Sequence, residues 1–219
     1  MVRVGWQEQV GPWLAVIAQV LRGGGLGVIP TDTLYGFAAR FDRPTAIRRI
    51  ATLKGRDRVR PFLLLIADRT MLGRLVAAEP PAPVLDLLWP GPVTALLPGR
   101  KTLDPLLRGA HDTVAVRHPA DPVLAELVAQ IGVPILSTSV NMQGESPLTD
   151  FAAIERDFGA HVDLLADGGA RAGRVASAIV DLSRRPPVLV RSGAREIDLE
   201  RLERRWQAAD ASDRGRPVP

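Results

Sequence analysis

The spacing of hydrophobic residues along the 219-residue chain predicts alternating helices and strands. Over residues 6–22, apolar side chains recur at steps of three and four, which is the period of an amphipathic helix, and three glycines at 23–25 end it. The segment LGVIP at 26–30 is short, apolar and β-branched, as is typical of a buried strand. A second helix is predicted over 44–53.

The rest of the chain repeats this alternation. Further helices are expected near 69–78 and 82–89, and over 121–131 and 149–158. Further strands are expected at 62–67, 94–99, 113–117, 133–137, 162–166, 175–182 and 187–191. Strands that alternate with helices of this length favour an α/β sheet covered by helices. Because some strands follow one another closely, the sheet should be mixed, with parallel and antiparallel pairs.

We expect a single main domain over residues 1–195, because no repeat or low-complexity linker divides the chain. From 196 to 219 the sequence begins as a helix and ends in a polar, proline-containing stretch. This pattern predicts a C-terminal helical extension whose last ten residues are frayed.

Composition excludes several classes of protein. The chain has no cysteine, which rules out a disulfide scaffold, a thiolate nucleophile and a zinc–thiolate site, and its three histidines argue against a multi-histidine metal centre. No apolar run approaches the roughly 18 residues of a membrane span, and no signal peptide opens the chain. We therefore expect a cytoplasmic protein without a membrane partner.

The charge is basic but ambiguous. Of the 28 cationic side chains, two are lysines and the remaining 26 are arginines, and the formal net charge is +4. This bias is explained most simply by a GC-rich coding sequence. The alternative is a surface that attracts phosphates or nucleic acid, which a charge of +4 alone does not establish.

Polar side chains follow two buried strands. The first set is PTDT at 30–33, and the second is STSVN at 137–141. In open α/β sheets, ligands bind just beyond the carboxyl ends of strands, so both sets are well placed to meet a substrate. A simple turn or helix cap is the alternative for each.

A cationic segment, LKGRDRVRP at 53–61, suits a polyphosphate, although a solvated loop is the alternative. Lys54 in this segment is one of only two lysines in an arginine-rich chain, which suggests that a compact positive charge is needed at this position. No P-loop, Rossmann or GxSxG motif is present. A site built from Lys, Arg, Ser, Thr and Asn favours phosphate chemistry by positioning and charge neutralisation.

Seven motifs in order carry a family resemblance: PTDTLYG, LKGR, WPGPVT, VAVR, STSVN, SAIVD and VLVRSG. Over about residues 10–195 they resemble the YrdC-like family of L-threonylcarbamoyladenylate synthases, in its short, single-domain TsaC type. The resemblance implies an open, twisted mixed sheet, wrapped by helices around a basic concave groove. It thus agrees with the fold class expected from the pattern.

The resemblance also implies an activity, that of a nucleotidyltransferase. L-Threonine, bicarbonate and ATP, the last with Mg²⁺, would give threonylcarbamoyl-AMP and pyrophosphate. A downstream transferase complex would use this product to modify tRNA, with direct contact between tRNA and this chain as an open alternative.

Matched position by position, the motifs imply two groups of site residues. Those for L-threonine are Thr33, Arg117, Ser139 and Ser177. Those for ATP are Lys54, Arg56, Arg60, Thr113, Asn141, Thr149 and Arg191. Within this set the resemblance gives Lys54 and Arg56 the catalytic role.

The chain departs from the family pattern at Val140, Gln143 and Ala178, close to the implied site. Two rival functions follow. One is an enzyme that forms a carbamoyl-adenylate on another amine. The other is a non-catalytic RNA-binding module, against which the scarcity of aromatic residues counts.

Overall fold

The structure is a computed structural model that describes residues 1–7, 9–55, 61–170 and 173–214. Ten strands form one sheet in the order β1-β8-β2-β3-β7-β4-β6-β5-β9-β10. The strands are β1 (Val2–Gly5), β2 (Gly27–Pro30), β3 (Tyr35–Arg40), β4 (Leu63–Leu65), β5 (Val93–Pro98), β6 (Thr113–Arg117), β7 (Ile135–Ser139), β8 (Leu164–Asp167), β9 (Ala178–Asp181) and β10 (Val188–Arg191).

The sheet is mixed, which confirms the expected fold class. Strands β1, β8 and β2 run parallel, as do the pairs β4–β6 and β5–β9, whereas the other neighbours are antiparallel. The α-helices are α1 (Pro12–Arg22), α2 (Pro44–Lys54), α3 (Ala82–Leu85), α4 (Pro122–Ile131), α5 (Phe151–Phe158) and α6 (Leu199–Arg214).

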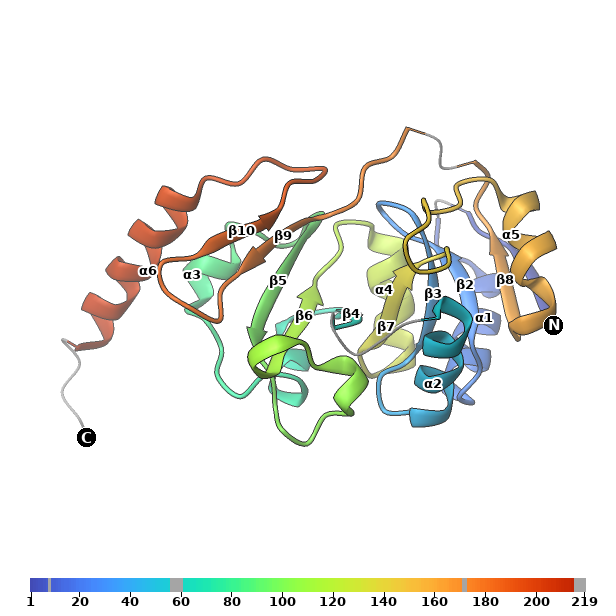
Figure 1. Ribbon diagram of the computed structural model, residues 1–219, viewed down its shortest axis with the longest axis horizontal. Helices are drawn as coiled ribbons and strands as arrows, with labels where there is room; N and C mark the ends of the chain where they lie inside the picture. The colour runs from blue at the N-terminus through green and yellow to red at the C-terminus, as the bar shows by residue number, and fades with distance from the viewer. Residues whose placement is uncertain (8, 56–60, 171–172, 215–219) are drawn as a thin grey trace.

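Helices cover both sides of the sheet. Figure 1 shows α2 and α5 in front of it and α1 and α4 behind it. Helix α1 buries one apolar stripe, Leu14, Ile17 and Leu21, and packs against α4. Asp121 begins α4, where its carboxylate accepts hydrogen bonds from the backbone amides of Val123 and Leu124. The core therefore lies on the side of α1 and α4 and beneath α2.

Five elements differ clearly from the sequence prediction. The first helix starts at Pro12 rather than at residue 6, and residues 2–5 form β1. Strand β3 was not predicted, because its small residues, two alanines and a glycine, have weak strand propensity. The helix expected at 69–78 is a 3₁₀-helix, Arg69–Arg74, and that expected at 82–89 is only α3.

The C-terminal extension is more ordered than predicted. Helix α6 reaches Arg214, so it includes part of the stretch expected to be frayed. It packs against α3, and Arg185 pairs with its Glu203 at 3.2 Å. The guanidinium of Arg185 also lies 4.9 Å from the ring centre of Trp206. These contacts hold the helix beside the sheet at its β10 end (Figure 1). Across the described ranges, no helix combines the length and apolar character that crossing a bilayer requires.

Asp163 links α2 to Leu26, the residue before β2, and replacing it should change how the free energy of unfolding depends on pH under acidic conditions. Its Oδ2 lies 2.7 Å from Arg49 Nη1 and accepts the Leu26 amide at 2.8 Å. The hydrogen bond from Arg49 is the main cause that lowers the pKa of Asp163 below 3.8. Because the folded pKa is lowered, the stabilisation is present above the unfolded pKa and is lost as pH falls through the folded value.

We therefore expect Asp163→Asn to lower the free energy of unfolding at pH 7. Below about pH 4, the free energy of unfolding should fall less in this variant than in the wild type, because the variant has no carboxylate to protonate at this position. Urea unfolding at pH 7, 4 and 3 measures both effects. Asp157→Asn is the control, because Asp157 pairs only with its chain neighbour Arg156 among the ion pairs of the described residues. Equal acid sensitivity of the wild type and Asp163→Asn would contradict the assignment.

Candidate functional site

The register of the strands places polar residues on one face of the sheet. Residues paired across strands point to the same side, and neighbours along a strand alternate. Leu63 of β4 pairs with Ala115 of β6 and with Ser137 of β7, so these three side chains point to the same face of the sheet. This face therefore carries Thr113, Arg117, Ser137 and Ser139.

The same face continues across β5, β9 and β10. Thr94 pairs with Ile179, and Ile179 pairs with Arg191. Ser177, two residues before Ile179, belongs to this side as well, and its Oγ lies 2.9 Å from Thr94 Oγ1. Arg191 Nη2 donates to the Ser177 carbonyl at 2.7 Å. We call this side of the sheet the polar face; its residues are Thr94, Thr113, Arg117, Ser137, Ser139, Ser177 and Arg191.

Lys54, the last residue of α2, holds the end of β7. Its Nζ donates to the carbonyl of Ser139 at 2.6 Å, the carbonyl of Asn141 at 3.0 Å and Oδ1 of Asn141 at 2.8 Å. The side chain is buried. A lysine at a helix C-terminus suits the negative end of the helix dipole, and Gly55 ends α2 in the left-handed conformation, with φ of 58°.

Asn141 organises the loop that follows. Its Oδ1 accepts from Ser139 Oγ at 2.6 Å, and its Nδ2 donates to the carbonyls of Met142 and Glu145. The loop then returns, because the Leu148 amide donates to the Val140 carbonyl at 2.8 Å. This return places Thr149 near the end of β7.

The PTDT turn after β2 is held by its own hydroxyls. Thr31 Oγ1 donates to the Leu34 carbonyl at 2.7 Å and accepts from the Thr33 amide at 3.2 Å. The Thr31 and Thr33 hydroxyl oxygens are 3.1 Å apart. Tyr35 begins β3, and its buried hydroxyl donates to the Gly169 carbonyl at 2.7 Å. These hydrogen bonds define the conformation of the turn around Thr33.

A buried ion pair joins this turn to β6. Arg117 Nη2 lies 2.9 Å from Asp32 Oδ1, and the two side chains are 2% and 11% exposed. Arg117 Nη1 donates to Thr33 Oγ1 at 3.2 Å. Burial raises the pKa of Asp32 despite the nearby guanidinium, and burial lowers the pKa of Arg117. The positive charge of Arg191 lowers the pKa of Arg117 further, so Arg191 also lies within electrostatic reach.

The predicted residues fall into two clusters with some exceptions. Thr33 and Arg117 form one, with Ser177 and Arg191 beside Arg117 on the polar face. Lys54 and Asn141 form the other, and it also contains Ser139, which the motifs grouped with threonine. Thr113 shares the polar face, but its hydroxyl donates to the Ala110 carbonyl at 2.9 Å. Arg56 and Arg60 lie outside the described residues.

Two residues that contact predicted site residues were not themselves predicted. They are Asp32, which pairs with Arg117, and Thr94, which pairs with Ser177. Both lie inside motifs already noted, PTDTLYG and WPGPVT. The motifs therefore contained the signal, but the contacts that give these residues a role depend on strand register.

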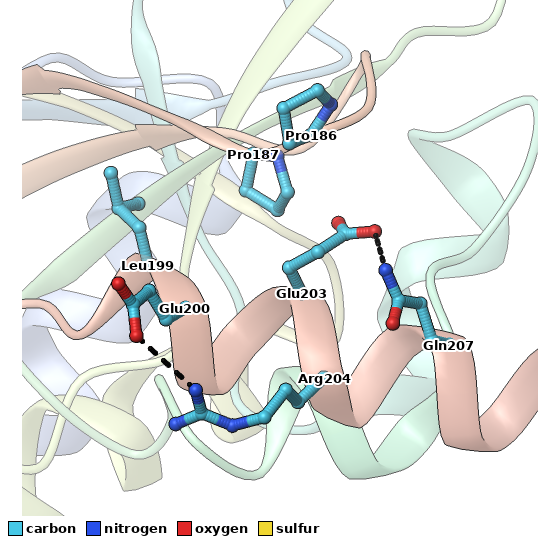
Figure 2. Close-up of a pocket in the computed structure, with 7 residues that line it drawn as sticks. All are labelled: Pro186, Pro187, Leu199, Glu200, Glu203, Arg204 and Gln207. Carbon is cyan, nitrogen blue, oxygen red and sulfur yellow. Dashed lines mark hydrogen bonds and ion pairs between the residues drawn. The ribbon is translucent and has the colours of Figure 1, made fainter.

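A depression elsewhere on the surface contains none of the predicted residues that the structure describes. It measures about 430 Å³ and lies between α6 and the prolines before β10, Pro186 and Pro187 (Figure 2). On its rim, Gln207 donates to Glu203 at 2.9 Å and Arg204 pairs with Glu200 at 3.3 Å. We therefore place the candidate site on the polar face.

Comparison with known proteins identifies the family of the chain. The Sua5/YciO/YrdC family model, described as "Telomere recombination", matches residues 19–193. The chain belongs to this family. The match includes every residue of both clusters that the structure describes. The candidate site of this chain therefore lies within the residues that the family model matches.

Curated relatives share a name. A threonylcarbamoyl-AMP synthase of Nitrosococcus oceani is 39% identical over 160 residues, which are 71% of this chain and 86% of the relative. A second, of Pyrococcus abyssi, is 33% identical over 202 residues, or 90% of this chain. The match covers only 58% of the length of the P. abyssi protein.

Solved structures confirm the fold. P. abyssi Sua5 complexed with L-threonine gives a TM-score of 0.82 at 31% identity, and the match covers 94% of this chain and 61% of that one. YciO of E. coli gives a TM-score of 0.77 at 25% identity, covering 90% and 96% respectively. The second match shows that this sheet and its helices account for nearly all of a whole family member.

Proposed function

We propose that this Sua5/YciO/YrdC chain is a threonylcarbamoyl-AMP synthase. It would convert L-threonine, bicarbonate and ATP into threonylcarbamoyl-AMP and pyrophosphate, which makes it a nucleotidyltransferase. The observation that carries the proposal is that the polar face is joined to two clusters, through Arg117 to Thr33 and through Ser139 to Lys54 and Asn141. One offers an arginine and hydroxyls for an amino acid, and the other offers a lysine and an amide, followed in the chain by a cationic segment, for a nucleotide.

The amino-acid half uses Arg117 and three hydroxyl residues. A guanidinium binds a carboxylate through two parallel hydrogen bonds, so Arg117 suits the carboxylate of threonine. Thr33, already bonded to Arg117, and Ser177, which Arg191 contacts, can bind the remaining polar atoms. Ser139 lies toward the other cluster, where the reacting groups of the two substrates would meet. The likeness to Sua5 complexed with L-threonine supports this arrangement.

The proposed ATP site uses the cluster that contains Lys54 and Asn141, together with residues near it. Lys54, Asn141 and Thr149 lie around the end of β7, while Thr113 and Arg191 lie on the polar face. Arg56 and Arg60 follow Lys54 in the chain and would add charge for the triphosphate. Mg²⁺ would enter with ATP as part of the substrate. No group of three or more His, Cys, Asp or Glu in the described ranges is arranged to hold a metal.

The reaction needs alignment rather than a covalent intermediate. The threonine amine adds to bicarbonate to give a carbamate and water. A carbamate oxygen then attacks the α-phosphorus of ATP, and the bond to the β-phosphate oxygen breaks, which releases pyrophosphate. Positioned cations stabilise the charge on the phosphoryl oxygens in this step. The product would pass to a transferase complex that modifies tRNA.

Pyrophosphate release by the purified chain tests the proposal. ATP, Mg²⁺, bicarbonate and L-threonine are supplied together, each is omitted in turn, and L-serine and other amino acids replace threonine. We expect release only with all four components and a strong preference for threonine. Release with a different amine would assign another substrate, and a folded chain that binds no ATP would contradict the enzyme and favour RNA binding.

A further inference from the structure

Asp32 lies inside the amino-acid half of the site and has no role in the scheme above. Both of its carboxylate oxygens are closed off from solvent; Oδ1 forms the ion pair with Arg117 Nη2 at 2.9 Å, whereas Oδ2 and Nε of Arg117 have no hydrogen-bond partner among the described residues. The backbone amides of Asp32 and Ala120 lie near enough to favour the charged carboxylate, but neither reaches hydrogen-bond geometry. Buried polar groups without partners are rare because each is costly.

An α-amino acid supplies the two missing partners. Its carboxylate can accept from Arg117 Nε, and its ammonium group can donate to the oxygens of Asp32. The two side chains are in contact, with Arg117 Nη2 2.9 Å from Asp32 Oδ1, so the unmatched Nε and Oδ2 belong to one ion pair that a small zwitterion can meet. The unmatched acceptor and donor therefore carry the signs of charge that the ammonium and carboxylate groups of an amino acid require.

We propose that Asp32 binds the α-amino group of the amino-acid substrate and accepts the proton that this group must lose. The proposal rests on the proposed function. An ammonium proton moves to the carboxylate, which leaves a neutral amine with a free electron pair. That pair forms the N–C bond with bicarbonate, and water leaves as the carbamate forms. Asp32 then returns its proton to solvent.

The charges around Asp32 suit a proton acceptor. Arg117 on β6 is the cation beside it, and Asp121, which caps α4, is a like charge that makes proton uptake easier. Arg174 approaches from the segment before β9, where its Nη1 donates to the Asp32 carbonyl at 3.1 Å. Burial raises the pKa of Asp32, which makes the carboxylate a stronger base. Since both oxygens are shielded, the PTDT turn must open locally when the substrate enters.

Paired binding measurements test the contact with the amine. The probes are L-threonine and (R)-3-hydroxybutyrate, which is threonine without its α-amino group, and the proteins are the wild type, Asp32→Asn and Asp42→Asn. Asp42 is the matched control, because it also pairs with an arginine, Arg40 at 2.6 Å, but lies on the surface. Calorimetry without ATP gives the ratio of the two dissociation constants for each protein.

We expect the wild type and Asp42→Asn to bind threonine about 10- to 100-fold more tightly than the analogue, and Asp32→Asn to bind both alike. A structural disturbance alone would weaken both probes and preserve the ratio. An unchanged ratio in Asp32→Asn overturns the proposal. If that variant does not fold, a wild type that binds both probes equally overturns it as well.

The pH profile tests the proton transfer. In the wild type, kcat/KM for threonine should fall as pH drops through the pKa of Asp32, and Asp32→Asn should lose this acidic limb. An identical limb in both proteins would contradict the role as base. A wild type that binds threonine in an Asp32-dependent way but releases no pyrophosphate would instead refute the proposed function alone.

Discussion

Arg117→Ala is expected to lower the free energy of unfolding by about 3–5 kcal/mol and to abolish threonine-dependent pyrophosphate release. The variant leaves the carboxylate of Asp32 buried without its cation, and that carboxylate already has a raised pKa. It also removes the donor that holds Thr33. Urea unfolding and the pyrophosphate assay measure the two losses.

A second substitution separates the two effects of this variant. Adding Asp32→Asn to Arg117→Ala removes the uncompensated charge, so most of the lost stability should return while activity stays absent. If the double variant is no more stable than Arg117→Ala, then the ion pair is not the cause of the destabilisation. If Arg117→Ala is as stable as the wild type, then the pair is not effectively buried in solution.

Lys54→Met is expected to reduce turnover by at least ~10²–10³-fold, the size of effect that losing one well-placed donor has in an active site, because Lys54 fixes Ser139 and Asn141 where the nucleotide would bind. Methionine keeps most of the side-chain volume but leaves the acceptors of Ser139 and Asn141 without the lysine. A stability loss of about 1–3 kcal/mol should follow, because buried acceptors lose their donor. The pyrophosphate assay and a thermal melt measure these changes.

The control for this variant is Lys101→Met, which replaces the other lysine of the chain, an exposed residue. It should leave both turnover and melting temperature unchanged. Full turnover in a folded Lys54→Met protein would remove Lys54 from the catalytic machinery. A loss of ATP binding equal to the loss of turnover would show that Lys54 acts on ground-state binding only.

Elements with strong local signals could be predicted from the sequence. Helix α4 is an example, because Asp121 caps it, Pro122 starts it and Gly132 ends it with φ of 78°. Strands β1 and β3 could not be predicted in this way. β1 owes its existence to parallel pairing with β8, far along the chain, and β3 is a central strand whose small residues are stabilised by two neighbours.

The site followed the same division. The motifs placed Lys54 and Asn141 in one group, and in the structure the two side chains meet at the end of β7. The contacts between Arg117 and Thr33, 84 positions apart, and between Thr94 and Ser177, 83 positions apart, depend on register across several strands. No local pattern encodes that register, which explains why Asp32 and Thr94 were not predicted as site residues.

The alternation of side chains offers a route to engineering. In β4, β6, β7 and β9, the polar face holds the odd-numbered residues, whereas even-numbered residues such as Val114, Val116 and Leu136 are fully buried in the core. A mutant library restricted to odd positions around the substrate, for example Leu63 and Ile179, would vary amine selectivity and leave the packing behind the sheet intact. Because such substitutions leave the core unchanged, variants that accept other amines could be selected without stabilising the protein beforehand.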